Sequence, residues 1–129
     1  MTSPALLASA LRAHARGLHS PEAAAELLIA QSWLHRTDFT SRFITIGRGP
    51  ADGRAMAIID WTAAITALQA GQLPCSGGER RMLRITASLD EGIPVDLRDT
   101  LTGLDNHNIQ LLVKAVLHAS GQRPSPQGP

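Results

Sequence analysis

The sequence is poor in aromatic residues, cysteine and long apolar runs, and each shortage excludes a class of protein. Only 3% of the 129 residues are aromatic and tyrosine is absent, so the bases of a single-stranded nucleic acid would find few rings to stack on. The one cysteine, Cys75, excludes an internal disulfide and a thiolate metal cluster, and it fits a reducing cytoplasm. No stretch approaches the roughly 18 to 20 apolar residues of a membrane span. These absences favour a cytoplasmic protein without a membrane partner.

The net charge is also small, and the composition of the chain predicts a helical domain. The net charge of +1 is too small to attract a polyanion through the overall field. Apolar residues make up 43% of the chain, and with so few aromatics the core must consist of Ala, Leu, Ile and Val, which suits helices. We expect a mainly α fold, or α+β if a hairpin forms, with five or six helices. A single globular domain is expected over 1–120, with a disordered tail at 121–129.

The stretch 58–71 has the clearest helix signals in the chain. Asp60 can cap a helix start, and Gly71 can adopt the left-handed conformation that ends one. Trp61, Ile65 and Leu68 recur at spacings of four and three, which places them on one face. We expect this face to be core and the rest of the chain to pack around it.

The N-terminal half predicts two helices and a hairpin. Ser3-Pro4 begins a helix that Gly17 interrupts, and Ser20-Pro21-Glu22 repeats this start for a second helix over about 21–35. A short hairpin is expected from 42–47 paired with 55–59, since β-branched residues flank a Gly- and Pro-containing turn. The alternative extends the central helix back to Arg54, because Ala55, Met56 and Ala57 are good helix formers.

The C-terminal half predicts three more helical segments. Ser76 and Glu79 have the spacing of a reciprocal cap, a short helical turn is expected over 96–102, and Asp105 caps a last helix that stops at Gly121. The apolar positions of this last helix recur with a period of 3.6 and comprise Ile109, Leu112, Val113, Val116 and Leu117.

The segment Cys75-Ser76-Gly77-Gly78-Glu79-Arg80 is a candidate anion site. It resembles the helix-start motif of ABC-type ATPases, a resemblance that implies contact between the backbone amides and a terminal phosphate. Glycines permit close approach and a helix N-terminus favours anions, so Ser76, Gly77, Gly78 and Arg80 would be the binding residues. The GxxxxGK[ST] loop that holds the other phosphates is missing from the sequence, which favours a plain capped helix.

Cys75 and the histidines are the candidate reactive groups. A helix start and Arg80 would lower the pKa of the Cys75 thiol, but a catalytic cysteine also needs a base, which only folding could bring close. The five histidines lack the spacing of a metal site. We therefore expect no catalytic residue, no metal and no cofactor.

Two features of the sequence bear on whether the protein binds DNA. Residues 96–117 have the outline of a helix-turn-helix, with Gly103 in the turn, and a basic cluster on the preceding helix comprises Arg80, Arg81 and Arg84. Residues 90–105, however, hold five acids and one arginine, which would repel phosphate. The alternative is that Arg80 and Arg84 pair with this acidic segment, in the same chain or in a neighbouring copy.

The blocks IIDWTAAITALQAG, PCSGGERRMLRITASL and VDLRDTLTGLDNHNIQLLVKAVLHASG resemble small proteins of unassigned function from actinomycete-type bacteria. The resemblance covers about residues 55–121 and implies a small cytoplasmic domain without known site residues. The function expected from the sequence is a non-enzymatic interaction module that forms a homodimer or binds another protein. The alternatives are a DNA-binding regulator and a small enzyme using Cys75 or the Ser76-Gly77-Gly78 helix start.

Overall fold

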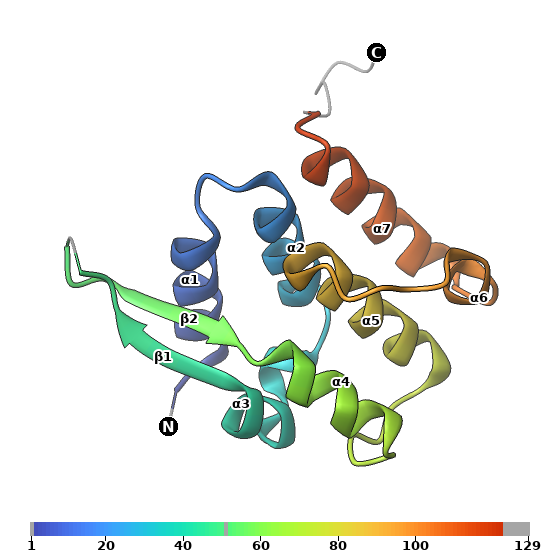
Figure 1. Ribbon diagram of the computed structural model, residues 1–129, viewed down its shortest axis with the longest axis horizontal. Helices are drawn as coiled ribbons and strands as arrows, with labels where there is room; N and C mark the ends of the chain where they lie inside the picture. The colour runs from blue at the N-terminus through green and yellow to red at the C-terminus, as the bar shows by residue number, and fades with distance from the viewer. Residues whose placement is uncertain (1, 51, 123–129) are drawn as a thin grey trace.

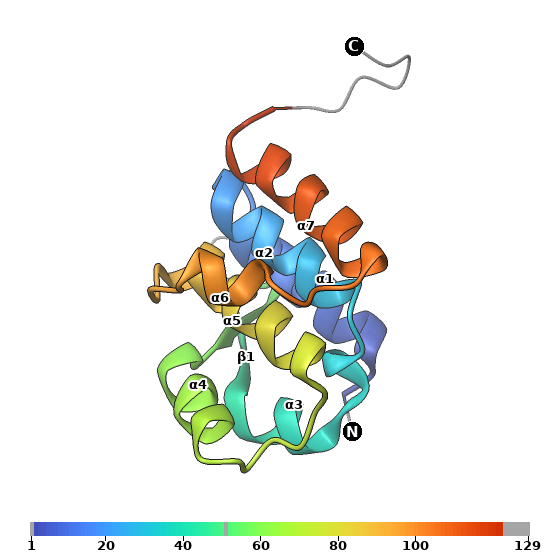
Figure 2. The same ribbon diagram turned by 90° about the vertical axis from the view of Figure 1, so that its right-hand side faces the viewer.

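The computed structural model describes residues 2–50 and 52–122, which fold into helices and one hairpin (Figures 1 and 2). The elements in chain order are α1 (Pro4–Ala15), α2 (His19–Ile29), a 3₁₀ turn η1 (Trp33–His35), α3 (Thr37–Phe43), β1 (Ile44–Arg48), β2 (Ala55–Ile59), α4 (Trp61–Gln69), α5 (Gly77–Glu91), α6 (Leu97–Leu101) and α7 (Asn106–Ala119). The predicted fold class, mainly α with one short hairpin, is confirmed. Of the tail predicted over 121–129, residues 123–129 lie outside the described part of the chain.

Side-chain caps set the starts of the four C-terminal helices, and the sequence predicts those at Asp60, Ser76 and Asp105. The Asp60 carboxylate accepts a hydrogen bond from the backbone N–H of Ala63 at 3.1 Å, and Asp105 caps α7 in the same way. At α5 both halves of the reciprocal cap between Ser76 and Glu79 are present. These caps involve residues three apart, so the local sequence is enough to specify them.

The second helix differs from its prediction at both ends. It begins at His19 after an N-cap residue, Leu18, that supplies no side-chain cap, and it ends at Ile29 rather than near 35. Glu22, expected in the first turn after a Ser-Pro start, instead accepts a hydrogen bond from the Gly17 N–H at 2.9 Å. This bond ties the segment that follows α1 to the first turn of α2.

Helix α3 was not predicted, and it moves the first strand to Ile44–Arg48 in place of 42–47. Phe39 and Phe43 lie four residues apart on α3 and both are buried. The Phe39 ring packs against Trp33, Phe43 and Trp61, with centroids 5.3, 5.6 and 6.2 Å away. Since all four aromatic residues of the chain meet here, aromatic packing between distant segments explains why a helix forms without a local signal.

The hairpin is antiparallel, with Ile44 opposite Ile59 and Ile46 opposite Ala57. Strand β2 spans the predicted residues, which excludes the alternative of a longer α4. Its buried side, with Ala57 and Ile59, packs on α1, and the hairpin lies at the opposite end of the molecule from α6 and α7 (Figure 1).

Helix α2, rather than α4, lies at the centre of the fold. The predicted core face of α4 is confirmed, with Trp61 2% exposed, but α4 packs mainly on α3 and α5. Helix α2 packs on α1, α5 and α7. Its Leu28 belongs to the main core, whereas Leu27 belongs to a second cluster with Met82 and Ala115. The contact between α2 and α7, about 90 residues apart in the chain, forms the cleft described below.

Candidate functional site

The start of α5 is closed by its own side chains. The Ser76 hydroxyl accepts a hydrogen bond from the Glu79 N–H at 3.1 Å, and a Glu79 carboxylate oxygen accepts one from the Ser76 N–H at 2.9 Å. A Cβ added at Gly77 would lie 3.0 Å from the Arg81 guanidinium. The amides proposed to hold an anion are therefore flanked by a carboxylate and an arginine of the same helix. The geometry is that of the capped helix, the alternative that the sequence left open.

Cys75 is a half-buried free thiol whose pKa is raised, which is opposite to the expectation from the sequence. Burial is the largest cause of the raised pKa, and the negative charge of Glu79 adds to it. Arg80 and Arg36 lower the pKa but do not outweigh these effects. A thiol held in its protonated form is a poor nucleophile, so the structure lends no activation to Cys75.

The three arginines of the basic cluster do not act together. Arg80 is exposed and Arg84 is half-buried, while Arg81 turns toward α6 and donates to the Asp99 carbonyl at 3.4 Å. Of the ion pairs found in residues 2–50 and 52–122, none joins Arg80 or Arg84 to the segment 90–105. The acidic segment thus meets Arg81, through a backbone carbonyl, rather than the two residues expected.

The segment proposed as a helix-turn-helix forms two helices of unequal length, α6 and α7. Helix α6 has five residues and packs on α5, whereas the motif requires the first helix to pack across the second. The Asp105 carboxylate accepts a hydrogen bond from the Asn108 N–H at 2.8 Å and so sits at the start of α7. A negative charge therefore stands at the end of α7 that would meet DNA.

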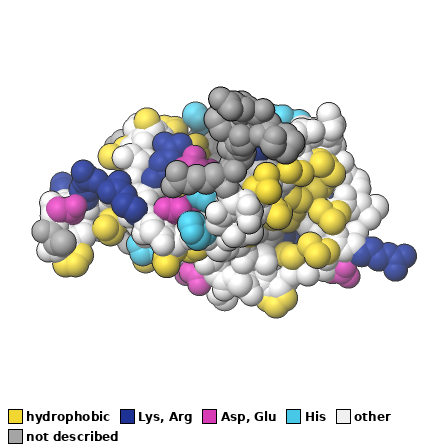
Figure 3. Space-filling view, turned by 90° about the horizontal axis from the view of Figure 1, so that it is seen from above, with side chains coloured by type: hydrophobic (Ala, Val, Ile, Leu, Met, Phe, Trp, Pro, Cys, Tyr) yellow, Lys and Arg dark blue, Asp and Glu magenta, His cyan; other side chains and the backbone are white. Residues whose placement is uncertain are grey.

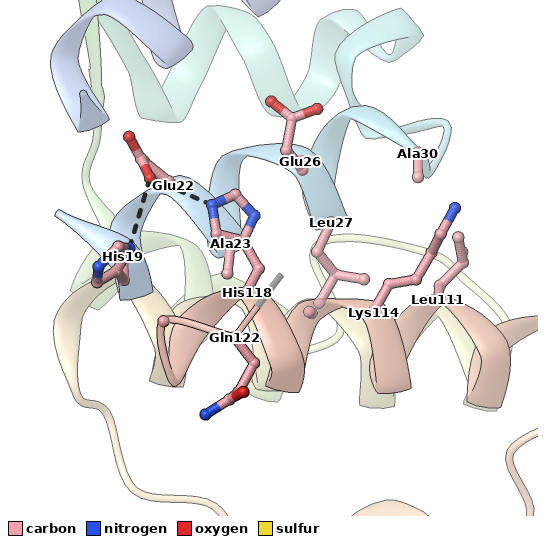
Figure 4. Close-up of a pocket in the computed structure, with 12 residues that line it drawn as sticks. His19, Glu22, Ala23, Glu26, Leu27, Ala30, Leu111, Lys114, His118 and Gln122 are labelled. Atoms are coloured by element: carbon pink, nitrogen blue, oxygen red, sulfur yellow. Dashed lines mark hydrogen bonds and ion pairs between the residues drawn. The ribbon is translucent and has the colours of Figure 1, made fainter. Parts of the chain in front are cut away.

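A cleft of about 540 Å³ lies between α2 and α7 and is referred to here as the α2–α7 cleft (Figure 4). Its apolar lining comprises Ala23, Leu27, Ala30, Leu111 and Ala115. Its polar lining comprises His19, Glu22, Glu26, Lys114, His118 and Gln122. The volume falls within the usual range for small-molecule sites, about 300 to 1,000 Å³.

The acidic residues around the α2–α7 cleft are already matched. The Glu26 carboxylate binds the Arg12 guanidinium at 2.7 and 3.0 Å. The Glu22 carboxylate accepts from the Gly17 N–H and lies 3.2 Å from His118 Nε2. These contacts lower the pKa of Glu22, with the Gly17 hydrogen bond as the largest cause. Lys114 forms no ion pair with any described residue, so it supplies the unmatched charge of the cleft.

A second cavity, of about 330 Å³, lies between α1, α2, β2 and α5 and contains one titratable group of interest, Asp90. An Asp90 carboxylate oxygen accepts a hydrogen bond from Trp61 Nε1 at 2.6 Å. Burial raises the pKa of Asp90, although the Trp61 hydrogen bond and the charge of His14 act in the opposite direction. Asp90 links α5 to α4 and is best understood as a structural contact.

The outward face of α7 is apolar although it points to solvent. The stripe that the sequence predicts, Ile109, Leu112, Val113, Val116 and Leu117, is the pattern that ordinarily faces a core. In the structure Val113 is 50% and Val116 54% exposed. Helix α7 turns Leu111, Ala115 and Ala119 toward α2 and α5, and of the predicted stripe Leu112 packs on the same cluster. Hydrophobic side chains gather in one area on the α7 side of the molecule (Figure 3).

The sequence did not point to the residues of the α2–α7 cleft. Glu22 and His118 are 96 positions apart, and their proximity depends on how α7 docks. One local signal was available, since Ala23, Ala30 and Ala115 are small residues on helix faces that meet, and small residues leave room for a groove. Across the described ranges, no three His, Cys, Asp or Glu side chains converge as metal ligands would, and no helix is both long and apolar enough to span a membrane.

Comparisons with protein families, curated proteins and solved structures found no match to this chain. The resemblance to actinomycete proteins therefore stays a prediction.

Proposed function

We propose that this chain is a non-enzymatic, cytoplasmic interaction module that self-associates through the outward face of α7, defined by Ile109, Val113 and Val116. The observation that carries this proposal is the orientation of α7. Val113 and Val116 of its apolar stripe are exposed to solvent, while Leu111, Leu112 and two alanines pack toward the protein. A regular apolar stripe on an exposed helix is typical of a surface that another helix covers.

A second copy is the simplest partner for this face. The positions 109, 113 and 116 have the i, i+4, i+7 spacing that allows a helix to pack against an identical helix about a two-fold axis. The 14 residues of α7 span about 21 Å at 1.5 Å per residue. A face of this length and about 10 Å width is smaller than the standard interface of about 800 Å² per partner. We therefore expect a reversible dimer with a dissociation constant in the micromolar range.

We propose a non-enzymatic role because the structure explains both features that suggested an enzyme without catalysis. The pKa of Cys75 is raised, and the Ser76-Gly77-Gly78 start is engaged in capping. Both are explained by packing and helix termination. The cytoplasmic setting rests on the single cysteine and the reducing environment that it fits.

Sedimentation velocity over about 1 to 500 µM tests the dimer. Wild-type protein should change from the monomer mass of 13.7 kDa toward twice that mass as concentration rises. The double variant Val113→Glu/Val116→Glu should stay monomeric while keeping its helical circular dichroism, because the two positions are exposed. Leu6→Glu, which alters an exposed leucine on α1, is the matched control and should dimerise like wild type.

A wild-type protein that remains near 13.7 kDa at every concentration would refute self-association. If Leu6→Glu disrupted the dimer as strongly as the α7 variant, the interface would lie elsewhere and the assignment to α7 would be wrong.

A further inference from the structure

We propose that the α2–α7 cleft binds a small amphipathic anion, an unbranched acyl chain that ends in a free carboxylate. This site lies on a different face of α7 from Val113 and Val116, and the proposal does not depend on self-association.

The shape of the cleft suits a narrow apolar chain. Ala23 on α2 and Ala30, the residue that follows α2, line the cleft together with Leu111 and Ala115 on α7, and the methyl groups of alanine leave a furrow where longer side chains would meet. Leu27 lies at the base of this furrow and is itself buried. An alkyl chain that lay along these residues would exclude water from apolar surface on both sides, which is the main source of affinity in such sites.

The charges around the cleft select an anionic head group. Figure 4 shows the Glu26 carboxylate pointing away from α7 and the Lys114 side chain rising from α7 toward α2. The Glu26 carboxylate forms an ion pair with Arg12. The Glu22 carboxylate is held by the Gly17 N–H and His118. The acids of the rim are thus matched within the protein, whereas the Lys114 ammonium is available at the Ala30 end of the cleft. A carboxylate beside Lys114 would place the acyl chain over the alanines.

Titration calorimetry with sodium decanoate tests the site directly. We expect a dissociation constant of about 0.1 mM for decanoate, which is reasonable for a ligand of this size in an open cleft. Decanol, which has the same chain without the charge, should bind at least about threefold more weakly, and acetate, which has the head group alone, should give no measurable heat. Two-dimensional NMR spectra should show decanoate shifting the amide signals of α2 and α7.

Two variants separate the contributions of charge and shape. Lys114→Gln should weaken decanoate binding by about fivefold and leave decanol binding unchanged, because only the ion pair is lost. Ala30→Trp should abolish binding of both ligands by filling the cleft at an exposed position. Arg98→Gln removes an exposed arginine on α6 and should bind like wild type. The two-dimensional NMR spectrum of each variant serves as the check that the variant is folded.

Three results would overturn the proposal. These are the absence of both heat and NMR shifts with decanoate up to about 5 mM, binding of decanol as tight as that of decanoate, and wild-type affinity of Lys114→Gln for decanoate. Co-sedimentation with phosphatidylglycerol vesicles distinguishes the source of the acyl chain, since vesicle binding without decanoate binding would also exclude a free carboxylate. The variant Val113→Glu/Val116→Glu should bind decanoate like wild type, so failure of the dimer would not affect this result.

Discussion

Trp61 is the side chain whose removal should cost the protein most stability. It is 2% exposed, packs against Phe39 in the aromatic cluster, and donates its indole N–H to the half-buried Asp90 at 2.6 Å. Trp61→Ala removes the ring and leaves the Asp90 carboxylate without its donor. We expect the free energy of unfolding to fall by about 3 to 5 kcal/mol, a large part of the roughly 5 to 15 kcal/mol of a typical domain.

Milder variants divide this cost between packing and hydrogen bonding. Trp61→Phe keeps an aromatic ring against Phe39 but loses the indole N–H, and it should cost about 1.5 to 3 kcal/mol, as expected for a hydrogen bond to a charged group. Adding Asp90→Asn should recover part of this loss, because the variant no longer holds an ionised carboxylate that lacks a donor. The double-mutant cycle then gives the coupling energy between the two residues.

Urea unfolding followed by circular dichroism at the helix band measures each variant without relying on Trp61 fluorescence. Thr62→Ala, which changes the exposed neighbour on α4, is the control and should stay within about 0.5 kcal/mol of wild type. A loss below about 1 kcal/mol for Trp61→Ala would show that α4 is not packed as described. Equal stability of Trp61→Phe and wild type would show that the hydrogen bond between Trp61 and Asp90 does not stabilise the fold.

Three further predictions concern charged residues. Burial raises the pKa of Asp90. The ionised carboxylate therefore lowers the stability of the folded protein as pH rises through and above the ordinary aspartate pKa of about 3.9. In urea melts, Asp90→Asn should gain stability relative to wild type between about pH 4 and 7. The pKa of Glu22 is lowered, first by the Gly17 N–H, so its contribution is present above about pH 4.3 and lost as pH falls; Glu22→Gln should lose stability at pH 7 and little at about pH 3. For DNA we expect no salt-sensitive binding of random duplex in fluorescence anisotropy. Micromolar binding that falls by about 0.9 log units per log unit of salt for each phosphate, and that Arg80→Glu/Arg84→Glu abolishes, would instead support the regulator.

Local chemistry made the C-terminal half predictable. Each of its helix starts depends on a side chain that accepts a hydrogen bond from a backbone N–H three residues ahead, as with Asp60 and Asp105. The local sequence is enough to specify such hydrogen bonds. Glycines end the helices where a left-handed residue is needed, as Gly92 does with φ of 71°. Neither feature depends on distant parts of the chain.

The N-terminal half depends on distant contacts, and the sequence predicted it less well. Helix α3 has no capping side chain at Arg36, and its Phe39 packs against Trp33 and Trp61 from other segments. The start of α2 is fixed by Glu22 binding Gly17 rather than by a cap residue. A local pattern cannot reveal a helix that tertiary packing selects.

The candidate sites were harder to predict than the fold, and α7 shows why. A period of 3.6 identifies which residues share a face, but it does not say whether that face or its neighbour meets the protein. Val113 and Val116 belong to the predicted stripe and face outward, whereas Ala115 and Ala119 face inward. Small inward residues allow α7 to approach α2 closely, and the same alanines leave the furrow of the cleft. One choice of orientation therefore produces both surfaces to which we assign a role: an outward face free for a second copy and a cleft with Lys114 at its edge.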